Sequence, residues 1–504
     1  MTKAYTPALT GFSRVWLIEG RARGDHAPSY QTSARMGGVT WAQGAVTPVK
    51  EPSSKQFDQF VEVAKVKGAS ERPSTSIVRH FPMDVVSEIL RMVRKGCSID
   101  LQVHWGDCTD PTVANKYKKV MVFEDVSFTN YSTDDLGAMT DGDRKEVMET
   151  GEINAKDLYE IVPMAYAERA GTLVTNEVVD VAICDSLSCG ECTSESDGCQ
   201  KILAVTLAAG GSPGTPPDLL YTLDGGSNWY AHDIETISSA NDPTGVACMG
   251  LYAVVISNDE GSLNYALLSE LDGSTDPEFT EVTTGFVAGG GPNDLKSVGN
   301  YLFIVGDGGY VYGTSDPTTG VSVLDAGIAT ADDLRAVDAL NDTFAVAVGD
   351  NSAIIKTEDG STWSAVDGPT GIAINYNAVA VKSTTEWWIG TSTGHLYYTV
   401  DGGETWTEKG FTGSGSGVVY DIVFASDSVA FLSHSTTTPR GRILRSNDGG
   451  YSWFVLPEGV GSLPLSDRIN ALAACSFDVN HIVGVGLGDD ASDGYIVVGE
   501  GPEG

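Results

Sequence analysis

Carboxylates come first among the side chains that could do chemistry, because four aspartates share one sequence context. Each follows a threonine or serine by two positions, precedes a glycine, and leads within a few residues to a tryptophan. The pairs are Asp224 with Trp229, Asp359 with Trp363, Asp401 with Trp406, and Asp448 with Trp453. In such a segment the carboxylate accepts hydrogen bonds from nearby backbone N–H groups, and glycine supplies a positive φ. We call this segment the Asp turn, and we expect the tryptophan to pack it against a core.

Four closely spaced cysteines form the second candidate cluster: Cys184, Cys189, Cys192 and Cys199. Their thiolates could hold a tetrahedral zinc ion, pair as two local disulfides, or stay free. The spacing does not match a paired C-x-x-C ribbon, so disulfides are favoured over metal. The remaining cysteines are expected to be buried thiols, with one possible pair between the first two: Cys97, Cys108, Cys248 and Cys475. In every alternative the cluster braces a long loop and is not a redox centre.

Other catalytic patterns are missing from the sequence. The seven histidines are scattered without metal-ligand spacing, and there is no G-x-S-x-G, P-loop or H-E-x-x-H segment. The sequence therefore predicts a protein without a catalytic site and without a cofactor.

The spacing of the Asp turns predicts the fold of residues 171–504. The tryptophans recur at intervals of roughly 40–50 residues, which is the period of a β-propeller blade made of four short strands. Two degenerate copies fill the gap between Trp229 and Trp363: Asp272 leads to Phe279, and Asp316 leads to Val321. Seven repeats result, with first strands expected to begin near Val179, Gly245, Asp294, Asp333, Asn375, Val419 and Arg468.

The last repeat contains three strand-like segments, at 469–475, 481–485 and 495–498, and no fourth. A blade without its outer strand would expose an unpaired edge. Residues 172–175, which precede the first repeat, can supply that strand. We therefore expect a seven-bladed propeller closed by a strand from its own N-terminal end.

Charge divides the chain at the same place. Residues 1–170 carry 21 basic and 23 acidic side chains, whereas residues 171–504 carry 10 and 45. Such a negative field repels nucleic acid and anionic membranes. It could attract cations or basic partners, although a solvated surface suited to high copy number or a salty milieu is the favoured interpretation. No apolar run is long enough to span a membrane and the first residues contain no apolar signal core, so we expect neither membrane insertion nor export.

Residues 1–170 have a different pattern. Strands are expected around 15–18, 60–66, 74–81, 99–105, 120–128 and 149–163, and the alternation in 99–105 favours pairing with 120–128. A helix is expected over 84–95, since its apolar residues share one face and Gly96 follows. The sum predicts a mainly β protein: an N-terminal β-sandwich with one flanking helix, then the propeller.

Residues 1–170 resemble the major tail proteins that form the tail tube of long-tailed phages. The resemblance rests on the order of elements and on the stretches 38–53 and 123–137. It implies a virion structural protein that is assembled in the host cytoplasm and located in the tail, where it forms rings and stacked rings with itself. DNA would pass through the lumen, and tape-measure and tail-terminator proteins would be its other partners. The resemblance also implies that residues 24–54 form an arm between rings, the alternative being an ordinary surface loop.

Residues 171–504 resemble propellers with BNR repeats, in which the Asp turn is called the Asp box, and more closely the non-catalytic, photosystem-assembly type than the sialidases. A sialidase needs three arginines converging from different blades, but only five arginines occur here, three of them in one repeat: Arg335, Arg440, Arg442, Arg445 and Arg468. A sialidase-like hydrolase is therefore disfavoured. The Asp-box residues are expected to be structural because they lie on the rim, whereas propeller ligands gather at the central channel.

Trp387 and Trp388 leave two alternatives open. Core packing is favoured, but one ring could face outward beside Tyr397 and Tyr398 and stack on a surface glycan. The sequence thus predicts first a tail tube subunit with an outward-facing acidic propeller as a decoration domain, and second a glycan-binding adhesion module.

Overall fold

We describe a computed structural model of the 504-residue chain. Before residue 170 it describes the residues 13–19, 30–32, 34–36, 46–52, 60–67, 74–80, 99–106, 117–133, 148–155, 157–161 and 165–169. After it, the described residues are 176–184, 199–207, 219–237, 242–258, 261–274, 277–369, 374–411, 417–435, 441–447, 449–451, 453–455, 468–488 and 494–500. The expected helix at 84–95 lies outside these residues. The chain divides into two compact units, Met1–Pro163 and Met164–Leu456 with Gly461–Glu503.

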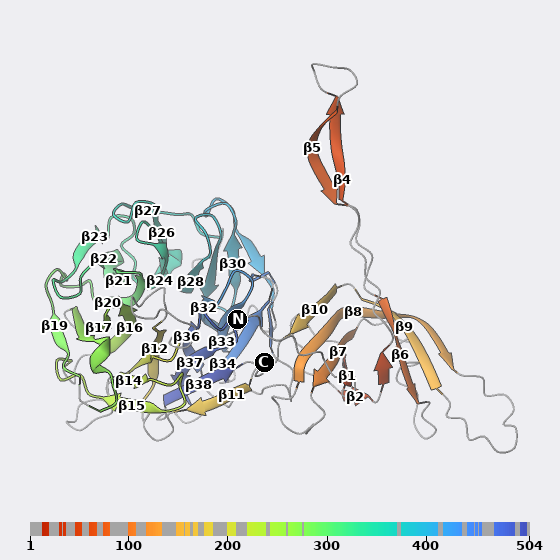
Figure 1. Ribbon diagram of the computed structural model, residues 1–504. Helices are drawn as coiled ribbons and strands as arrows, with labels where there is room; N and C mark the ends of the chain where they lie inside the picture. The colour runs from red at the N-terminus through yellow and green to blue at the C-terminus, as the bar shows by residue number, and fades with distance from the viewer. Residues whose placement is uncertain are drawn as a thin grey trace, which may run out of the picture. The chain divides into compact units, whose positions relative to one another are not determined.

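The first unit consists of strands in its described part (Figure 1). Eight of them form one antiparallel sheet in the order β2-β1-β7-β8-β9-β6-β3, with β10 also paired to β8. Their bounds are β1 (Ser13–Glu19), β2 (Tyr30–Thr32), β3 (Ala34–Met36), β6 (Ser74–His80), β7 (Ile99–Gly106), β8 (Tyr117–Thr133), β9 (Met148–Asn154) and β10 (Asp157–Ile161). The expected pairing of 99–105 with 120–128 is confirmed by β7 and β8, where Leu101 lies opposite Phe123. The β-sandwich itself stays a prediction.

Two further strands of this unit form a sheet of their own. β4 (Val46–Pro52) and β5 (Phe60–Lys67) pair antiparallel, with Val46 opposite Lys67 and Pro52 opposite Phe60. Neither pairs with any other strand in the described part of the chain. Of the predicted arm at 24–54, residues of β2 and β3 therefore join the large sheet, and only β4 belongs to this hairpin.

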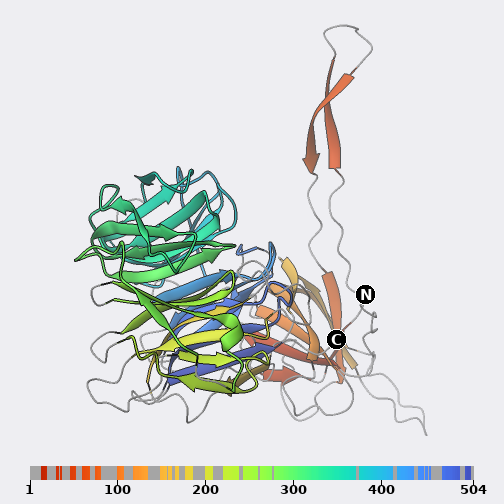
Figure 2. The same ribbon diagram turned by 60° about the vertical axis from the view of Figure 1, so that its left-hand side comes forward.

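The second unit is a seven-bladed propeller, in which each blade is one four-stranded antiparallel sheet (Figures 1 and 2). Blade 1 contains β12 (Val178–Ile183), β13 (Ile202–Thr206), β14 (Leu219–Thr222) and β15 (Trp229–His232). Blade 2 contains β16 (Pro243–Met249), β17 (Tyr252–Ser257), β18 (Ser262–Leu267) and β19 (Thr280–Val282). Blade 3 contains β20 (Pro292–Val298), β21 (Tyr301–Gly306), β22 (Tyr310–Thr314) and β23 (Ser322–Ala326). Blade 4 contains β24 (Leu334–Asn341), β25 (Phe344–Gly349), β26 (Ile354–Thr357) and β27 (Trp363–Ala365). Blade 5 contains β28 (Tyr376–Val381), β29 (Trp387–Thr391), β30 (Leu396–Thr399) and β31 (Thr407–Lys409). Blade 6 contains β32 (Val418–Phe424), β33 (Ala430–Ser435), β34 (Gly441–Ser446) and β35 (Phe454–Val455). In the described part of this unit, three short 3₁₀ turns follow strands: η3 (Leu268–Glu270), η4 (Asp307–Gly309) and η5 (Asp350–Ser352).

Blade 7 closes the ring. Its strands β36 (Arg468–Ala474), β37 (Ile482–Leu487) and β38 (Gly494–Glu500) are completed by β11 (Ala165–Arg169), which precedes blade 1 in the sequence. Closure by an N-terminal strand is thus as expected, but the expected segment 172–175 is wrong. The strand lies earlier because Tyr166 opposes Gly499 and packs its ring where a side chain on that glycine would lie.

The core of the propeller lies between blades. The second strand of most blades is almost wholly apolar and buried on both faces, as in β25, where all six residues are buried. Such strands read as continuous apolar runs because neighbouring sheets cover both of their faces. Blade 6 differs, because β33 also buries Ser433, His434 and Ser435. In the described residues, no helix is long and apolar enough to cross a bilayer.

Candidate interaction face of the propeller

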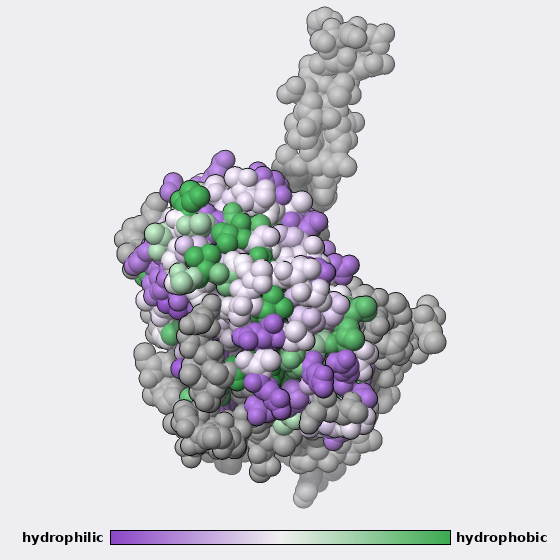
Figure 3. Space-filling model, turned by 90° about the vertical axis from the view of Figure 1, so that its left-hand side faces the viewer, coloured by the Kyte–Doolittle hydropathy of each residue, from purple (hydrophilic) through white to green (hydrophobic). Residues whose placement is uncertain are grey.

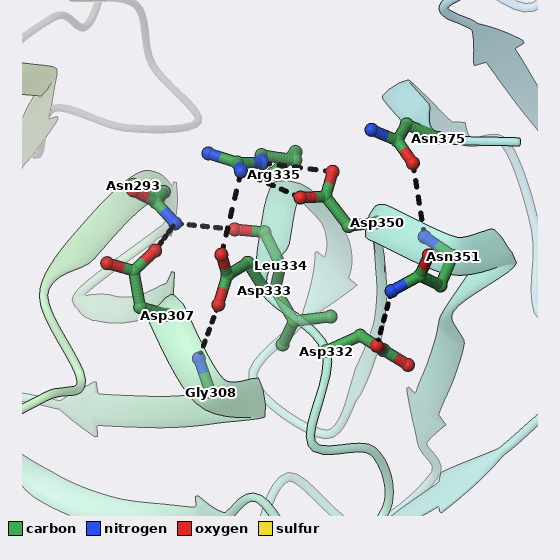
Figure 4. A network of polar contacts seen from close by, with 10 residues as sticks. All are labelled: Asn293, Asp307, Gly308, Asp332, Asp333, Leu334, Arg335, Asp350, Asn351 and Asn375. Atoms are coloured by element: carbon green, nitrogen blue, oxygen red, sulfur yellow. Dashed lines mark hydrogen bonds and ion pairs between the residues drawn. The ribbon is translucent and has the colours of Figure 1, made fainter.

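One end of the propeller carries a polar network across blades 3, 4 and 5 (Figure 4). It forms where inner strands begin and where the turns η4 and η5 leave the second strands. Each of these turns begins with an aspartate, Asp307 or Asp350, directly after a glycine that ends the strand. Because both turns lie beside the start of an inner strand, their side chains can reach the next blade.

Arg335 is the one cation drawn in this network, and its charge is already paired. Its Nε and Nη2 donate to the two carboxylate oxygens of Asp350 at 3.2 and 2.7 Å, and Asp333 lies 3.6 Å away. The contact with Asp350 is bidentate, the strong geometry for an arginine and a carboxylate, and it raises the pKa of the guanidinium. About 42% of the Arg335 side chain is exposed, so the pair lies at the surface.

The network connects blades 3 and 4 through two hydrogen bonds, and a third bond within blade 3 orients the Asn293 amide. The Asn293 amide donates to the Asp307 carboxylate at 2.8 Å and to the Leu334 carbonyl at 2.9 Å. The backbone N–H of Gly308 donates to the Asp333 carboxylate at 2.8 Å. A turn of blade 3 is thereby fixed to the first residues of blade 4.

The turn η5 connects blades 4 and 5. It has Asn351 and Ser352 where the equivalent turn of blade 3, η4, has two glycines. Asn351 and Ser352 have φ of 52° and 68°, and the corresponding residues of η4 are Gly308 and Gly309. A positive φ is costly for residues other than glycine. The side chains compensate here, because the Asn351 amide donates to Asp332 at 2.7 Å and the Ser352 hydroxyl donates to the Ile374 carbonyl at 3.1 Å.

The polar groups of this face pair largely with one another. Its arginine is neutralised by aspartates of its own blade, so it cannot clamp a substrate carboxylate without losing that pairing. Figure 3 shows the molecule from a side turned by 90° from the ring view, and there the apolar residues gather mainly at the upper left with white and purple residues around them. Few large apolar side chains of the described residues are exposed. One of them, Ile328, is 87% exposed on a turn whose N–H groups at 328 and 329 donate to Asp325 at 3.0 Å.

A second polar site lies around the central axis. Three aspartates lie directly after the register shift on the inner strands of blades 1, 3 and 6: Asp180, Asp294 and Asp421. Each carboxylate accepts a hydrogen bond from the inner strand of the next blade: from the N–H groups of Val246 and Val337 at 2.8 Å, and of Leu472 at 2.7 Å. These three aspartates are therefore inter-blade contacts, and we call them the axial aspartates.

Burial shifts the pKa of the axial aspartates upward. Desolvation raises the pKa of Asp180 to about 7 and that of Asp421 to about 6, against the opposing effect of their backbone hydrogen bonds. The pKa of Asp294 is also raised, first by desolvation and then by the charge of Asp180. Since blades 1 and 3 are not neighbours, this interaction is further evidence that the carboxylates surround the axis.

The positive charge of Lys296 opposes the rise in the pKa of Asp180 and of Asp421. Its ammonium lies 2.7 Å from the Asp338 carboxylate, which also accepts the Val381 N–H at 2.7 Å. The described residues contain no group of three histidine, cysteine or acidic side chains that could hold a metal ion.

The Asp turns have the geometry expected from the sequence. In blade 5 the Thr399 hydroxyl donates to Asp401 at 2.7 Å and accepts the Gly403 N–H at 3.0 Å, and Asp401 accepts the Thr405 N–H at 2.8 Å. Hydrogen bonds from Thr405 and Thr399 lower the pKa of Asp401 to about 2. The same pattern recurs around Asp224 and Asp359, whereas Asp448 lies outside the described residues. Trp229, Trp363 and Trp453 are buried, and Trp406 is partly exposed.

The glycan-stacking interpretation of Trp387 and Trp388 is wrong. Both side chains have 0% exposure because successive residues of β29 point to opposite faces of a sheet that is covered on both sides. Trp387 packs with Phe344 of blade 4, and Trp388 stacks on Tyr398 with ring centroids 4.6 Å apart.

The cysteine cluster is not brought together as expected. Cys184 is disulfide-bonded to Cys248, and Cys199 to Cys475. The disulfides are therefore not local, and two of the four cysteines considered for zinc have no thiolate to offer. Cys248 and Cys475, expected as buried thiols, are buried but oxidised. Four further cysteines lie outside the described residues: Cys97, Cys108, Cys189 and Cys192. The possible Cys97–Cys108 pair therefore stays a prediction.

No protein-family model matches the chain. No curated protein matches it either. Solved structures with some similarity include YCF48 bound to D1 peptide (17% identity, 67% of this chain and 97% of that chain, TM-score 0.49) and YCF48 from Cyanidioschyzon merolae (15%, 66% and 98%, 0.48). Another is the WD40 β-propeller domain of Doa1 (13%, 68% and 97%, TM-score 0.46). The strand order described above defines this chain as a protein with a seven-bladed β-propeller.

Proposed function

We propose that the protein is a structural subunit of a phage-type tail, whose first unit assembles into the stacked rings of a tail tube. The propeller is then an outward-facing, non-enzymatic contact domain. The sequence resemblance of stretches 38–53 and 123–137 to tail tube proteins supports the first part. A domain of this size does not fit in a lumen through which DNA passes, which supports an outward propeller.

The observation that carries assembly is the β4–β5 hairpin. A two-stranded hairpin is marginally stable alone in water, and both of its edges present unpaired N–H and C=O groups to any further strand. In the described part of the chain no third strand pairs with it. A neighbouring copy of the chain would supply the missing partner, so we assign the arm between rings to residues 46–67 in place of 24–54.

The proposal that the propeller is not an enzyme is supported by its arginines. Arg335 is paired with Asp350, Arg468 with Glu177, and Arg445 is 3% exposed beneath its own blade's surface. These groups lie on blades 4, 7 and 6, and each has a structural partner. Among the described residues, these three arginines are therefore not available as a free convergent set for a substrate carboxylate.

Electron microscopy of the purified full-length protein tests this function. Rings or tubes are expected for the wild type, and only unassembled protein for a variant in which a short Gly-Ser linker replaces residues 46–67. An Arg335→Ala variant is the matched control and should still assemble, since it alters only the propeller. A wild type that stays monomeric at high concentration, or tubes that form without the hairpin, would contradict the proposal.

A further inference from the structure

Ring closure is the one place where the propeller depends on a strand from elsewhere in the sequence. Every blade from 1 to 6 is built from four consecutive strands, but blade 7 is completed by β11. Five residue pairs make this contact, from Ala165 opposite Glu500 to Arg169 opposite Ile496. Closure of the ring between blades 7 and 1 thus depends on the pairing of β11 with β38.

Both disulfides found in the described residues involve blade 1, and one of them crosses the joint between blades 7 and 1. Cys199–Cys475 connects blade 1 to blade 7 across 276 residues, and Cys184–Cys248 connects blade 1 to blade 2 across 64. All four cysteines are buried, with at most 4% exposure. Blade 1 is therefore covalently attached on both sides.

The other described contacts at the joint between blades 7 and 1 are noncovalent. Blade 7 has Ala471 at the position that Asp421 occupies in blade 6, so no axial aspartate crosses this joint. Its apolar cluster is mostly valine, isoleucine and alanine, with Trp229 as its one buried aromatic side chain. Its polar contacts include those of Glu177 with Arg468 and Asn470, and the hydrogen bond from Asn470 to the Val178 carbonyl.

We propose that Cys199–Cys475 is a redox latch on ring closure. With both thiols reduced, the joint between blades 7 and 1 is held by β11 and by the contacts above, and it opens locally. With the disulfide formed, the first and last blades are covalently joined and β11 is kept on β38. This inference does not rest on the proposed tail function.

The chemistry of the latch is thiol–disulfide exchange with a low-molecular-weight disulfide such as glutathione disulfide. One cysteine thiolate attacks the glutathione disulfide, forms a mixed disulfide and releases one glutathione thiolate. The second cysteine thiolate then attacks the protein sulfur of the mixed disulfide and releases the other glutathione thiolate. The two protein thiols lose two electrons and two protons, and the glutathione disulfide is reduced to two glutathione thiols. Because disulfides persist in oxidising surroundings, the latch would close outside a reducing cytoplasm.

Hydrogen exchange of the full-length protein, read by mass spectrometry, tests the latch. On reduction with a phosphine, with free thiols at 199 and 475 verified by alkylation, amides of β11 and β38 should exchange at least tenfold faster. Amides of β29 and β30 in blade 5 should not change. Reoxidation with glutathione disulfide should restore the slow exchange.

Two variants localise the effect. Cys199→Ser/Cys475→Ser should exchange quickly in β11 under either condition, and the matched control Cys184→Ser/Cys248→Ser should stay slow while oxidised. If the first variant fails to fold, the reduced and reoxidised wild type still decides the question. Unchanged exchange after verified reduction, an equal increase in blade 5, or a control as fast as the first variant would each overturn the proposal.

Discussion

At the scale of single residues, a buried hydroxyl controls the Asp turn. Thr399 is 1% exposed, and its Oγ1 serves Gly403 N–H and the Asp401 carboxylate together. Thr399→Val keeps the shape but leaves the Gly403 N–H without its acceptor. An unsatisfied buried donor costs about 1–3 kcal/mol, so we expect the free energy of unfolding to fall by that amount in urea titrations.

Thr407→Val is the matched control for this change, because Thr407 is exposed on the next strand, β31. It should alter stability by less than about 0.5 kcal/mol. Equal stability of the two variants would show that the turn does not depend on the hydroxyl.

The axial aspartates set a pH dependence of stability. Their folded-state pKa values, about 7 for Asp180 and about 6 for Asp421, lie above the value of roughly 4 for an unfolded aspartate. The folded state therefore binds more protons between pH 4 and 7, and stability should fall as pH rises through that range. Asp401 acts in the opposite sense only at lower pH, because its pKa is lowered.

Urea unfolding between pH 5 and 8 at constant ionic strength measures this slope. The wild type should be more stable at pH 5, and Asp180→Asn/Asp421→Asn should show a smaller slope, whatever its absolute stability, because amides do not titrate. A slope that is unchanged in the double variant would assign the pH dependence to other groups.

At the scale of strands, glycine allows the second strand to meet the start of the inner strand. A Cβ on Gly349 would lie 2.0 Å from the Asp333 carbonyl oxygen, and one on Gly486 would lie 2.1 Å from that of Arg468. These are backbone atoms that cannot turn away. We expect Gly349→Ala to destabilise the propeller by about 1–3 kcal/mol, the usual cost of overpacking.

Gly410→Ala is the control for this substitution. Nothing lies within 4 Å of its Cβ position and its φ is not positive, so the change should be neutral or stabilising by about 0.4–1 kcal/mol. Thermal unfolding of both variants would distinguish them, and a neutral Gly349→Ala would show that the two strands can separate without cost.

The repeats were predictable at this scale because each Asp turn fixes the junction of the last two strands of a blade. Inner strands begin at 178, 243, 292, 334, 376, 418 and 468, within two residues of the expected starts. Trp387 and Trp388 were harder to place because alternation cannot identify an outward face on a strand covered on both sides. Sequence reasoning missed one signal in the aligned repeats. An aspartate stands at the same inner-strand position in three of them, at Asp180, Asp294 and Asp421.

The remaining features depend on contacts between distant parts of the chain. Ring closure brings Cys199 beside Cys475, although the two are 276 residues apart in the sequence. Closeness in the sequence therefore did not identify the disulfide partner of Cys199. The network around Arg335 combines asparagine, aspartate and backbone groups from three blades and has no sequence motif. Closure by β11 in place of residues 172–175 followed from the opposition of Tyr166 and Gly499, which the sequence does not disclose.

At the scale of the whole molecule, the formal net charge of −37 should oppose compaction. Residues 171–504 contain 45 acidic and 10 basic side chains, so most exposed charges of the propeller repel one another. Salt weakens that repulsion, since the Debye length falls from about 30 Å at 0.01 M to about 10 Å at 0.1 M. We expect the thermal midpoint of the propeller transition to rise by several degrees between about 0.01 and 0.3 M NaCl at pH 8.

Magnesium chloride at matched ionic strength separates screening from cation binding. If the acidic surface is only a solvated field, both salts should stabilise the propeller by a similar amount. A much larger effect of magnesium at millimolar concentration would indicate a specific cation site instead, which the described residues do not supply. A midpoint that stays constant or falls with NaCl would mean that the carboxylates are already compensated within the folded ring, and the repulsion argument would then be wrong.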